Sequence, residues 1–292
     1  AMAFWQGALV MLIRSVQGSL GTNVQRYANR AERPLRMLNI LGFVLQVLAG
    51  PMDTVAYSLG PQTALAPLGT ALSLCFDFLA APLVHGDSVP MKNVFAAVAV
   101  VCGTALCLTY GVPANAAPSP PPPPEEFAIY AAVVSAACAA PLGVVILMRH
   151  RVGRVDGVAH AALIALLGSM TLVAGKTLIA DLQEASVDHI ALIVLHALVM
   201  AAVVSAHLYV QNRSFGRYSL VLLTPAMGAL GLLANVTTGF WLYNEVPGYM
   251  PRFIQGIAVL CLGLLMLVPA QPPSSNIWAA HYRNLRSAAS VL

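Results

Sequence analysis

Four ionisable residues lie inside otherwise apolar stretches of the sequence and are the side chains best suited to chemistry. They are Arg14, Asp53, Asp77 and Lys176. Five amides occur in the same kind of stretch, at Gln17, Gln46, Gln62, Gln211 and Asn235, and three of them, Gln46, Gln62 and Asn235, complete the set. A charge at the centre of a bilayer costs about 3 kcal/mol on insertion scales, so each of the four should face the interior of a helix bundle. Together the seven side chains predict a polar core.

Two interpretations of this polar core remain open. The groups line a transport site, or they pair as cation with carboxylate and fasten helices together. A bare divalent ion prefers carboxylates that no cation compensates, and two cations with two anions do not plainly offer this, so any metal-binding residues stay unknown. In either case we predict that Asp53 and Asp77 point inward. Their expected partners are Arg14, Lys176, Gln46 or Asn235.

The composition is that of an all-α, polytopic membrane protein. Apolar residues make up 59% of the 292 residues, charged residues only 9%, and the mean hydropathy is +0.77; a globular domain carries roughly 25% charged residues. Nine segments are long enough to span a bilayer as helices. They cover about 4–25, 37–59, 62–84, 93–111, 127–148, 158–180, 189–211, 218–243 and 252–270.

The charges of the connecting loops predict the orientation. If alternate loops lie on opposite sides, one side receives twelve Lys and Arg residues, beginning with Arg26 and Arg30, and the other only Arg252. By the positive-inside rule the N-terminus is then outside or lumenal and the C-terminus inside. The same cations sit in short loops between apolar runs, so the basic balance does not indicate nucleic-acid binding.

The third and eighth apolar segments resemble each other at an offset of 158 residues. The matched positions are Pro67 with Pro225, Asp77 with Asn235, and Asp87 with Glu245. The eighth segment comes five spans after the third, so the second copy is inverted relative to the first, as in transporters built from inverted repeats. Pro67 and Pro225 each remove a helix hydrogen bond and predict matched helix breaks. The acids at the span ends, Asp87 and Glu245, are either caps or charges of a vestibule.

This repeat divides the chain. We predict a first repeat of four helices over 1–111, a proline-rich linker over 112–126, a fifth helix over 127–148, a second repeat over 149–270 and an interfacial tail over 271–292. A pseudo-two-fold axis in the membrane plane should relate the two repeats.

Two strings of the sequence resemble the NIPA-type magnesium transporters of the drug/metabolite transporter superfamily. The first is Ala56-Tyr57 followed by Pro61–Gly69, and the second is Leu167–Thr171 followed by Lys176. The resemblance implies a nine-helix bundle with the N-terminus outside and transport of Mg²⁺ or a related small cation. The sequence departs from the family at Asp77, where asparagine is common, and at Asp87, where the family usually has glutamate.

Three functions therefore stay open: a Mg²⁺-type cation transporter, a small-metabolite transporter, and a non-transporting subunit of a larger membrane complex that keeps the fold. Enzyme activity is not expected, because no Ser/His/Asp or Cys/His set recurs at a useful spacing. His160, His196 and His207 stand singly on apolar segments and are interpreted as packing residues. No cofactor is expected, apart from Mg²⁺ as a substrate; the expected partners are the lipid bilayer, the cargo and, in the third case, other membrane proteins.

Overall fold

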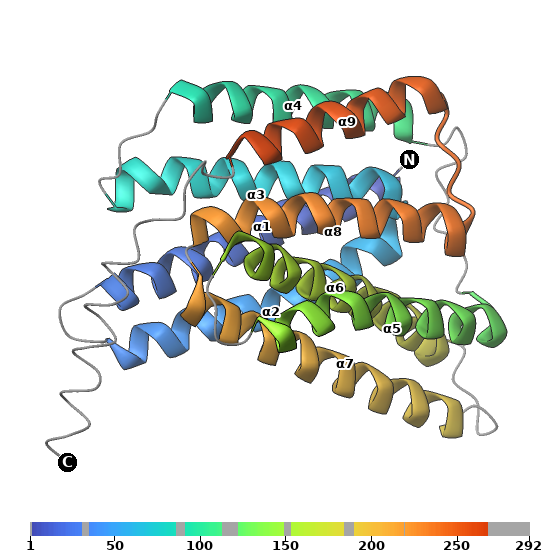
Figure 1. Ribbon diagram of the computed structural model, residues 1–292. Helices are drawn as coiled ribbons and strands as arrows, with labels where there is room; N and C mark the ends of the chain where they lie inside the picture. Colours follow the sequence, from blue (N-terminus) through green and yellow to red (C-terminus); the bar gives the residue numbers. More distant parts are fainter. Residues whose placement is uncertain are drawn as a thin grey trace, which may run out of the picture.

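A computed structural model describes residues 2–30, 35–85, 91–112, 122–148, 153–183, 190–218 and 220–267. These residues form nine α-helices, which run in alternating directions (Figure 1). They are α1 (Met2–Arg30), α2 (Arg36–Leu59), α3 (Gln62–His85), α4 (Met91–Gly111), α5 (Pro124–Leu147), α6 (Arg154–Gln183), α7 (Ile190–Arg217), α8 (Leu220–Tyr243) and α9 (Met250–Leu267). Asp87, the predicted tail at 271–292 and most of the predicted linker lie outside the described residues.

Seven of these helices are long and apolar enough to cross a membrane: α2, α3, α4, α5, α6, α7 and α9. The chain thus fits a multi-pass membrane protein, but the predicted count of about nine spans is not established. Of the nine described helices, α1 and α8 do not meet this criterion of length and hydropathy. α8 lies in the middle of the bundle (Figure 1), whereas α1 keeps an exposed apolar face that includes Trp5, Leu9 and Ile13.

The order of helix contacts in the first half of the chain recurs in the second. In the first half α1 packs against α2 and α3, and α3 against α4; in the second α6 packs against α7 and α8, and α8 against α9. The bounds of α3, moved by 158 residues, are those of α8. Contacts of α3 with α8, α4 with α9 and α2 with α6 join the halves. Inverted repeats would produce such recurrence, and the pseudo-two-fold axis stays a prediction.

The tightest contact between the halves is a glycine seam at one edge of the bundle, where α4 lies along α9 (Figure 1). A Cβ atom added to Gly103 of α4 would lie 2.5 Å from the backbone nitrogen of Leu260 and 2.7 Å from the carbonyl oxygen of Gly256. Across the same seam a Cβ on Gly263 would lie 2.8 Å from the carbonyl oxygen of Ala96. Glycine at these positions lets the two backbones touch.

The helix breaks predicted at Pro67 and Pro225 are not seen, since α3 and α8 each continue through their proline. Each proline is the sixth residue of its helix, so the carbonyl it leaves free belongs to the second residue, in the first turn. A proline at this place disturbs little of the helix that follows.

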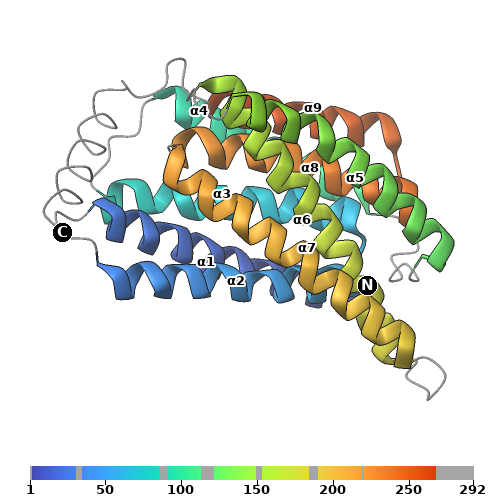
Figure 2. The ribbon, with the colours of Figure 1, turned by 60° about the horizontal axis from the view of Figure 1, so that its bottom comes forward.

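To name the two ends of the bundle, we call the end where α1, α3, α5, α7 and α9 begin the Met2 end, and the opposite end the Leu267 end. Figure 2 shows the same alternation of the helices from a second direction.

Candidate functional site

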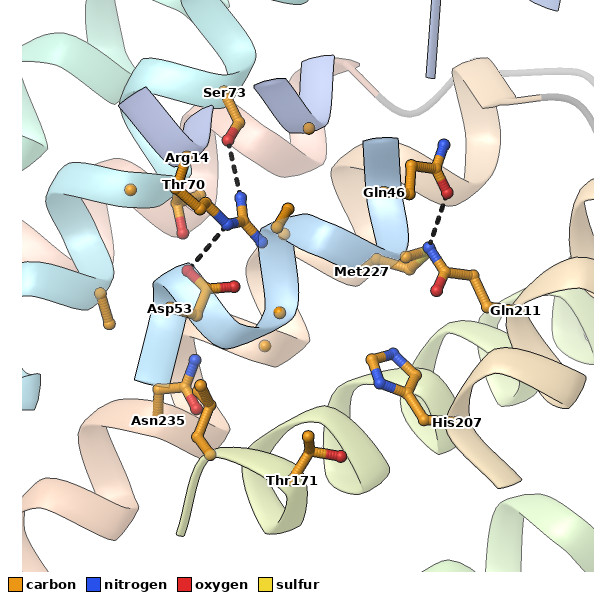
Figure 3. A pocket seen from close by; sticks show the side chains of 18 of the residues that line it. Arg14, Gln46, Asp53, Thr70, Ser73, Thr171, His207, Gln211, Met227 and Asn235 are labelled. Atoms are coloured by element: carbon orange, nitrogen blue, oxygen red, sulfur yellow. Dashed lines mark hydrogen bonds and ion pairs between the residues drawn. The ribbon is translucent and has the colours of Figure 1, made fainter. Parts of the chain in front are cut away.

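A cavity of about 430 Å³ lies inside the bundle, between α1, α2, α3, α6, α7 and α8 (Figure 3). Five of the seven predicted polar-core residues line it: Arg14, Gln46, Asp53, Asp77 and Asn235. The other two, Gln62 and Lys176, are buried beside it. Helices from both halves of the chain thus bring most of the predicted set to one place.

The charged centre of this cavity is an ion pair between α1 and α2. Arg14 Nε lies 2.7 Å from Asp53 Oδ1, and Arg14 Nη1 donates a hydrogen bond to Ser73 Oγ of α3 at 3.2 Å (Figure 3). The side chains of Arg14 and Asp53 keep 28% and 14% of their surface exposed. The pair therefore faces the cavity and joins three helices.

A proline that the sequence analysis did not single out lies beside this pair. Pro51 interrupts the hydrogen bonding of α2 and lines the cavity together with Val47. Because proline has no N–H, the carbonyl of Val47 has no donor four residues later. The carbonyl of Val47 thus lacks its usual helix hydrogen bond, and Val47 and Asp53 line the same cavity.

Asp77 receives hydrogen bonds from two residues of α1 that the sequence analysis did not name. Ser19 Oγ donates to Asp77 Oδ1 at 2.5 Å, and Asn23 Nδ2 donates to the same oxygen at 3.0 Å. The signal was present in the sequence, since Ser15, Ser19 and Asn23 recur every four residues and so lie on one face of a helix.

Amide side chains continue the polar lining between α1, α2 and α7. Gln46 Nε2 donates to Thr22 Oγ1 and to Gln25 Oε1, each at 3.1 Å, and Gln211 Nε2 donates to Gln46 Oε1 at 3.4 Å. His207, interpreted from the sequence as a packing residue, also lines the cavity (Figure 3).

Glu245 caps the start of α3. After α8 the chain turns through Asn244, whose φ of 50° lies in the left-handed region. The Glu245 carboxylate is 3% exposed, and its Oε2 accepts a hydrogen bond from the backbone N–H of Thr63 at 2.8 Å. A Cβ on Gly239 would lie 2.8 Å from that oxygen, so glycine makes room for it. The helix dipole favours a carboxylate at this N-terminus. Of the two roles considered for Glu245, a cap or a vestibule charge, this arrangement corresponds to the cap.

Gln62 and Lys176 lie next to this cap. Gln62 Nε2 donates to Asn235 Oδ1 at 3.3 Å, which connects the cap region to the cavity. Lys176 Nζ sits 3.6 Å from the centre of the Tyr243 ring, a cation–π contact, and interacts electrostatically with Glu245.

Other polar side chains within the described helices bond to one another and fasten the bundle. Ser169, from the second string of the family resemblance, bonds Tyr130 of α5 at 2.8 Å and Thr238 of α8 at 2.9 Å. His196 of α7 bonds Asp181 of α6 near the Met2 end.

Among the described residues no three His, Cys, Asp or Glu side chains come together to hold a metal ion. A divalent cation in the cavity would therefore meet one or two carboxylates, with amide and backbone oxygens and its own water completing the shell, a mode that suits Mg²⁺.

No protein-family model, curated protein or solved structure matches the chain. The class that the fold defines is a multi-pass, all-α membrane protein with a polar cavity among its helices. The link to NIPA-type transporters rests on the two sequence strings alone.

Proposed function

We propose that this chain is a membrane transporter whose cargo passes through the polar cavity. The observation that carries the proposal is an ionisable lining, with Arg14, Asp53 and Asp77 around about 430 Å³ inside a bundle of membrane-length helices. This volume falls within the roughly 300–1,000 Å³ typical of small-molecule sites. Charged groups within membrane bundles commonly mark substrate and ion pathways.

Mg²⁺ is the first cargo to test, because the two strings resemble magnesium transporters. The cavity offers carboxylates at Asp53 and Asp77 and amides at Gln46 and Asn235, groups suited to an ion that keeps part of its water. The Arg14–Asp53 pair neutralises one of these carboxylates, so a small polar metabolite remains the second cargo class.

The rival function is that of a non-transporting subunit in a larger membrane complex. The observation favouring it is the same Arg14–Asp53 pair, which also links α1 to α2. On that interpretation the polar lining stabilises the fold and moves nothing.

Asp77→Asn separates the two functions, because the amide keeps the shape of the side chain and loses the charge. If Asp77 belongs to a transport site, Mg²⁺ uptake into proteoliposomes should fall at least tenfold when normalised to folded protein from size-exclusion chromatography. Asp181→Asn is the matched control, since Asp181 bonds His196 away from the cavity lining, and its normalised uptake should match that of the unmutated protein.

Poor folding of Asp77→Asn with normal uptake per folded molecule would contradict the transport role of Asp77. Absence of uptake by the unmutated protein, across divalent cations and common metabolites, would favour the subunit function.

A further inference from the structure

The lining of the cavity ends before the Met2 end of the bundle. The lining extends toward the other end, with Thr22 in the last third of α1, Gln211 in the last quarter of α7 and Thr224 in the first quarter of α8. Toward the Met2 end its polar lining stops at Tyr57 and Asn235. Beyond them lie five residues, each at most 6% exposed, that we call the closing cluster: Gln62, Thr63, Lys176, Tyr243 and Glu245.

Four of the five residues of the closing cluster carry a buried polar atom with no hydrogen-bond partner among the described residues. These atoms are Gln62 Oε1, Thr63 Oγ1, Lys176 Nζ and Tyr243 Oη. Buried polar groups in proteins are generally hydrogen-bonded, to protein or to ordered water. The four atoms supply donors and acceptors that suit water molecules, which buried polar spaces commonly hold.

Lys176 connects the parts of the cluster. Its ammonium lies over the Tyr243 ring at the end of α8 and attracts Glu245, while Glu245 holds the backbone N–H of Thr63 at the start of α3. The positive charge on Lys176 thus supports contacts among α6, the end of α8 and α3. Loss of that charge would remove both the cation–π contact and the attraction to Glu245.

We propose that Lys176 is a proton-binding site that couples transport to proton movement by holding the closing cluster shut while it is charged. The proposal rests on the proposed transport function. In the step itself one N–H bond of the ammonium breaks, its electron pair stays on Nζ, and the proton passes to a water molecule, which becomes hydronium. The neutral amine then no longer attracts Glu245, and α3 separates from the end of α8. On the orientation predicted from the loop charges, this opens the cavity to the outside.

Among the groups around Lys176, Glu245 is the one that carries the opposite charge. Tyr243 and Glu245 face it from the end of α8, Thr54 of α2 touches the neighbouring Gly175, and Tyr57 of α2 interacts with Glu245. Tyr130 of α5 interacts with Tyr243. On α7, His196 is engaged by Asp181. Proton release therefore changes the Lys176–Glu245 couple from a neutral pair to a single negative charge.

Hydrogen–deuterium exchange of the peptide containing Thr63 tests the closing cluster without any cargo, because the Thr63 amide is protected by Glu245 only when the cluster is closed. Three proteins in nanodiscs are compared at each pH: unmutated, Lys176→Arg, which stays charged, and Lys176→Met, which is never charged. Comparison at one pH cancels the intrinsic exchange rate. We expect the unmutated peptide to match Lys176→Arg in acid and to exchange at least threefold faster in alkali, and Lys176→Met to exchange fast throughout.

Equal exchange in the unmutated protein and in Lys176→Arg at every pH would overturn the proposal. His196→Gln is the control for the nearest histidine pair at this end, and it should reproduce the pH dependence of the unmutated protein. If His196→Gln removes that dependence, the proton site is His196 and not Lys176.

A flux experiment tests the coupling itself. Proteoliposomes contain a Mg²⁺ indicator and the pH dye pyranine, and Mg²⁺ is added outside. Mg²⁺ entry should be accompanied by proton exit in the unmutated protein, should fall at least tenfold in Lys176→Arg, and should proceed without proton movement in Lys176→Met. Mg²⁺ entry with no pyranine signal in the unmutated protein would refute the coupling. No Mg²⁺ entry would count against the proposed cargo, while the exchange comparison still decides the role of Lys176.

Discussion

Removal of either partner of the Arg14–Asp53 pair should destabilise the bundle more than removal of both. Arg14→Met leaves the Asp53 carboxylate facing the cavity without its cation. Breaking a fully buried pair in this way costs about 3–5 kcal/mol. Here the two side chains keep 28% and 14% of their surface exposed to the cavity, so we expect about 2–3 kcal/mol for the single variant.

The double variant Arg14→Met with Asp53→Leu removes both charges and leaves apolar side chains in their place. It should recover about 2 kcal/mol relative to the sum of the two single variants, because neither charge is stranded. Thermal and denaturant unfolding in detergent micelles, followed by fluorescence-detected size-exclusion chromatography, gives the four corners of the cycle. If the cavity is the transport site, the folded double variant should show no uptake.

A coupling energy below about 0.5 kcal/mol, the limit expected for independent sites, would refute this reasoning. It would mean that cavity water already solvates both groups and that the ion pair contributes nothing to the contact between α1 and α2.

Two further predictions concern the packing and the cap. Gly103→Ala should lower stability by about 1–3 kcal/mol, because its Cβ would meet the Leu260 backbone at 2.5 Å. Gly143→Ala in α5, where a Cβ meets nothing within 4 Å, is the control and should be neutral or stabilising. Equal thermal shifts for the two variants would contradict the glycine seam. Glu245→Gln should lower the free energy of unfolding by about 1–3 kcal/mol, because the cap of α3 loses its charge and Lys176 loses its counterion. Glu125→Gln at the exposed start of α5 is the control and should change the thermal midpoint little.

The lengths of the apolar segments predicted the described helices well, because composition decides whether a segment is surrounded by lipid or by water. The first segment was nevertheless predicted at 4–25, whereas α1 covers Met2–Arg30. The part beyond the predicted end begins at Arg26, whose charge indicates a loop in the sequence, yet Ala28 within it is buried against the protein.

Burial cost predicted a partner for Asp53 and named Arg14 among the candidates, because a charge inside a bundle needs a counterion. The same reasoning missed the donors of Asp77, since Ser19 and Asn23 are neutral and a search for counterions passes over them. Pro51 was missed for a different reason: the residue 158 positions later is Tyr209, so a search for repeated prolines does not find it.

The glycine seam has a consequence for how the chain is made. α9 is the last described helix to leave the ribosome, yet the surface it covers belongs to α4, completed about a hundred and fifty residues earlier. Until α9 is inserted, the face of α4 around Val100, Gly103 and Cys107 is left to lipid or to a helper protein of the insertion machinery. A chain cut before Met250 would therefore present a persistent small-residue groove to the bilayer, and quality-control factors that survey membrane proteins would be expected to retain it.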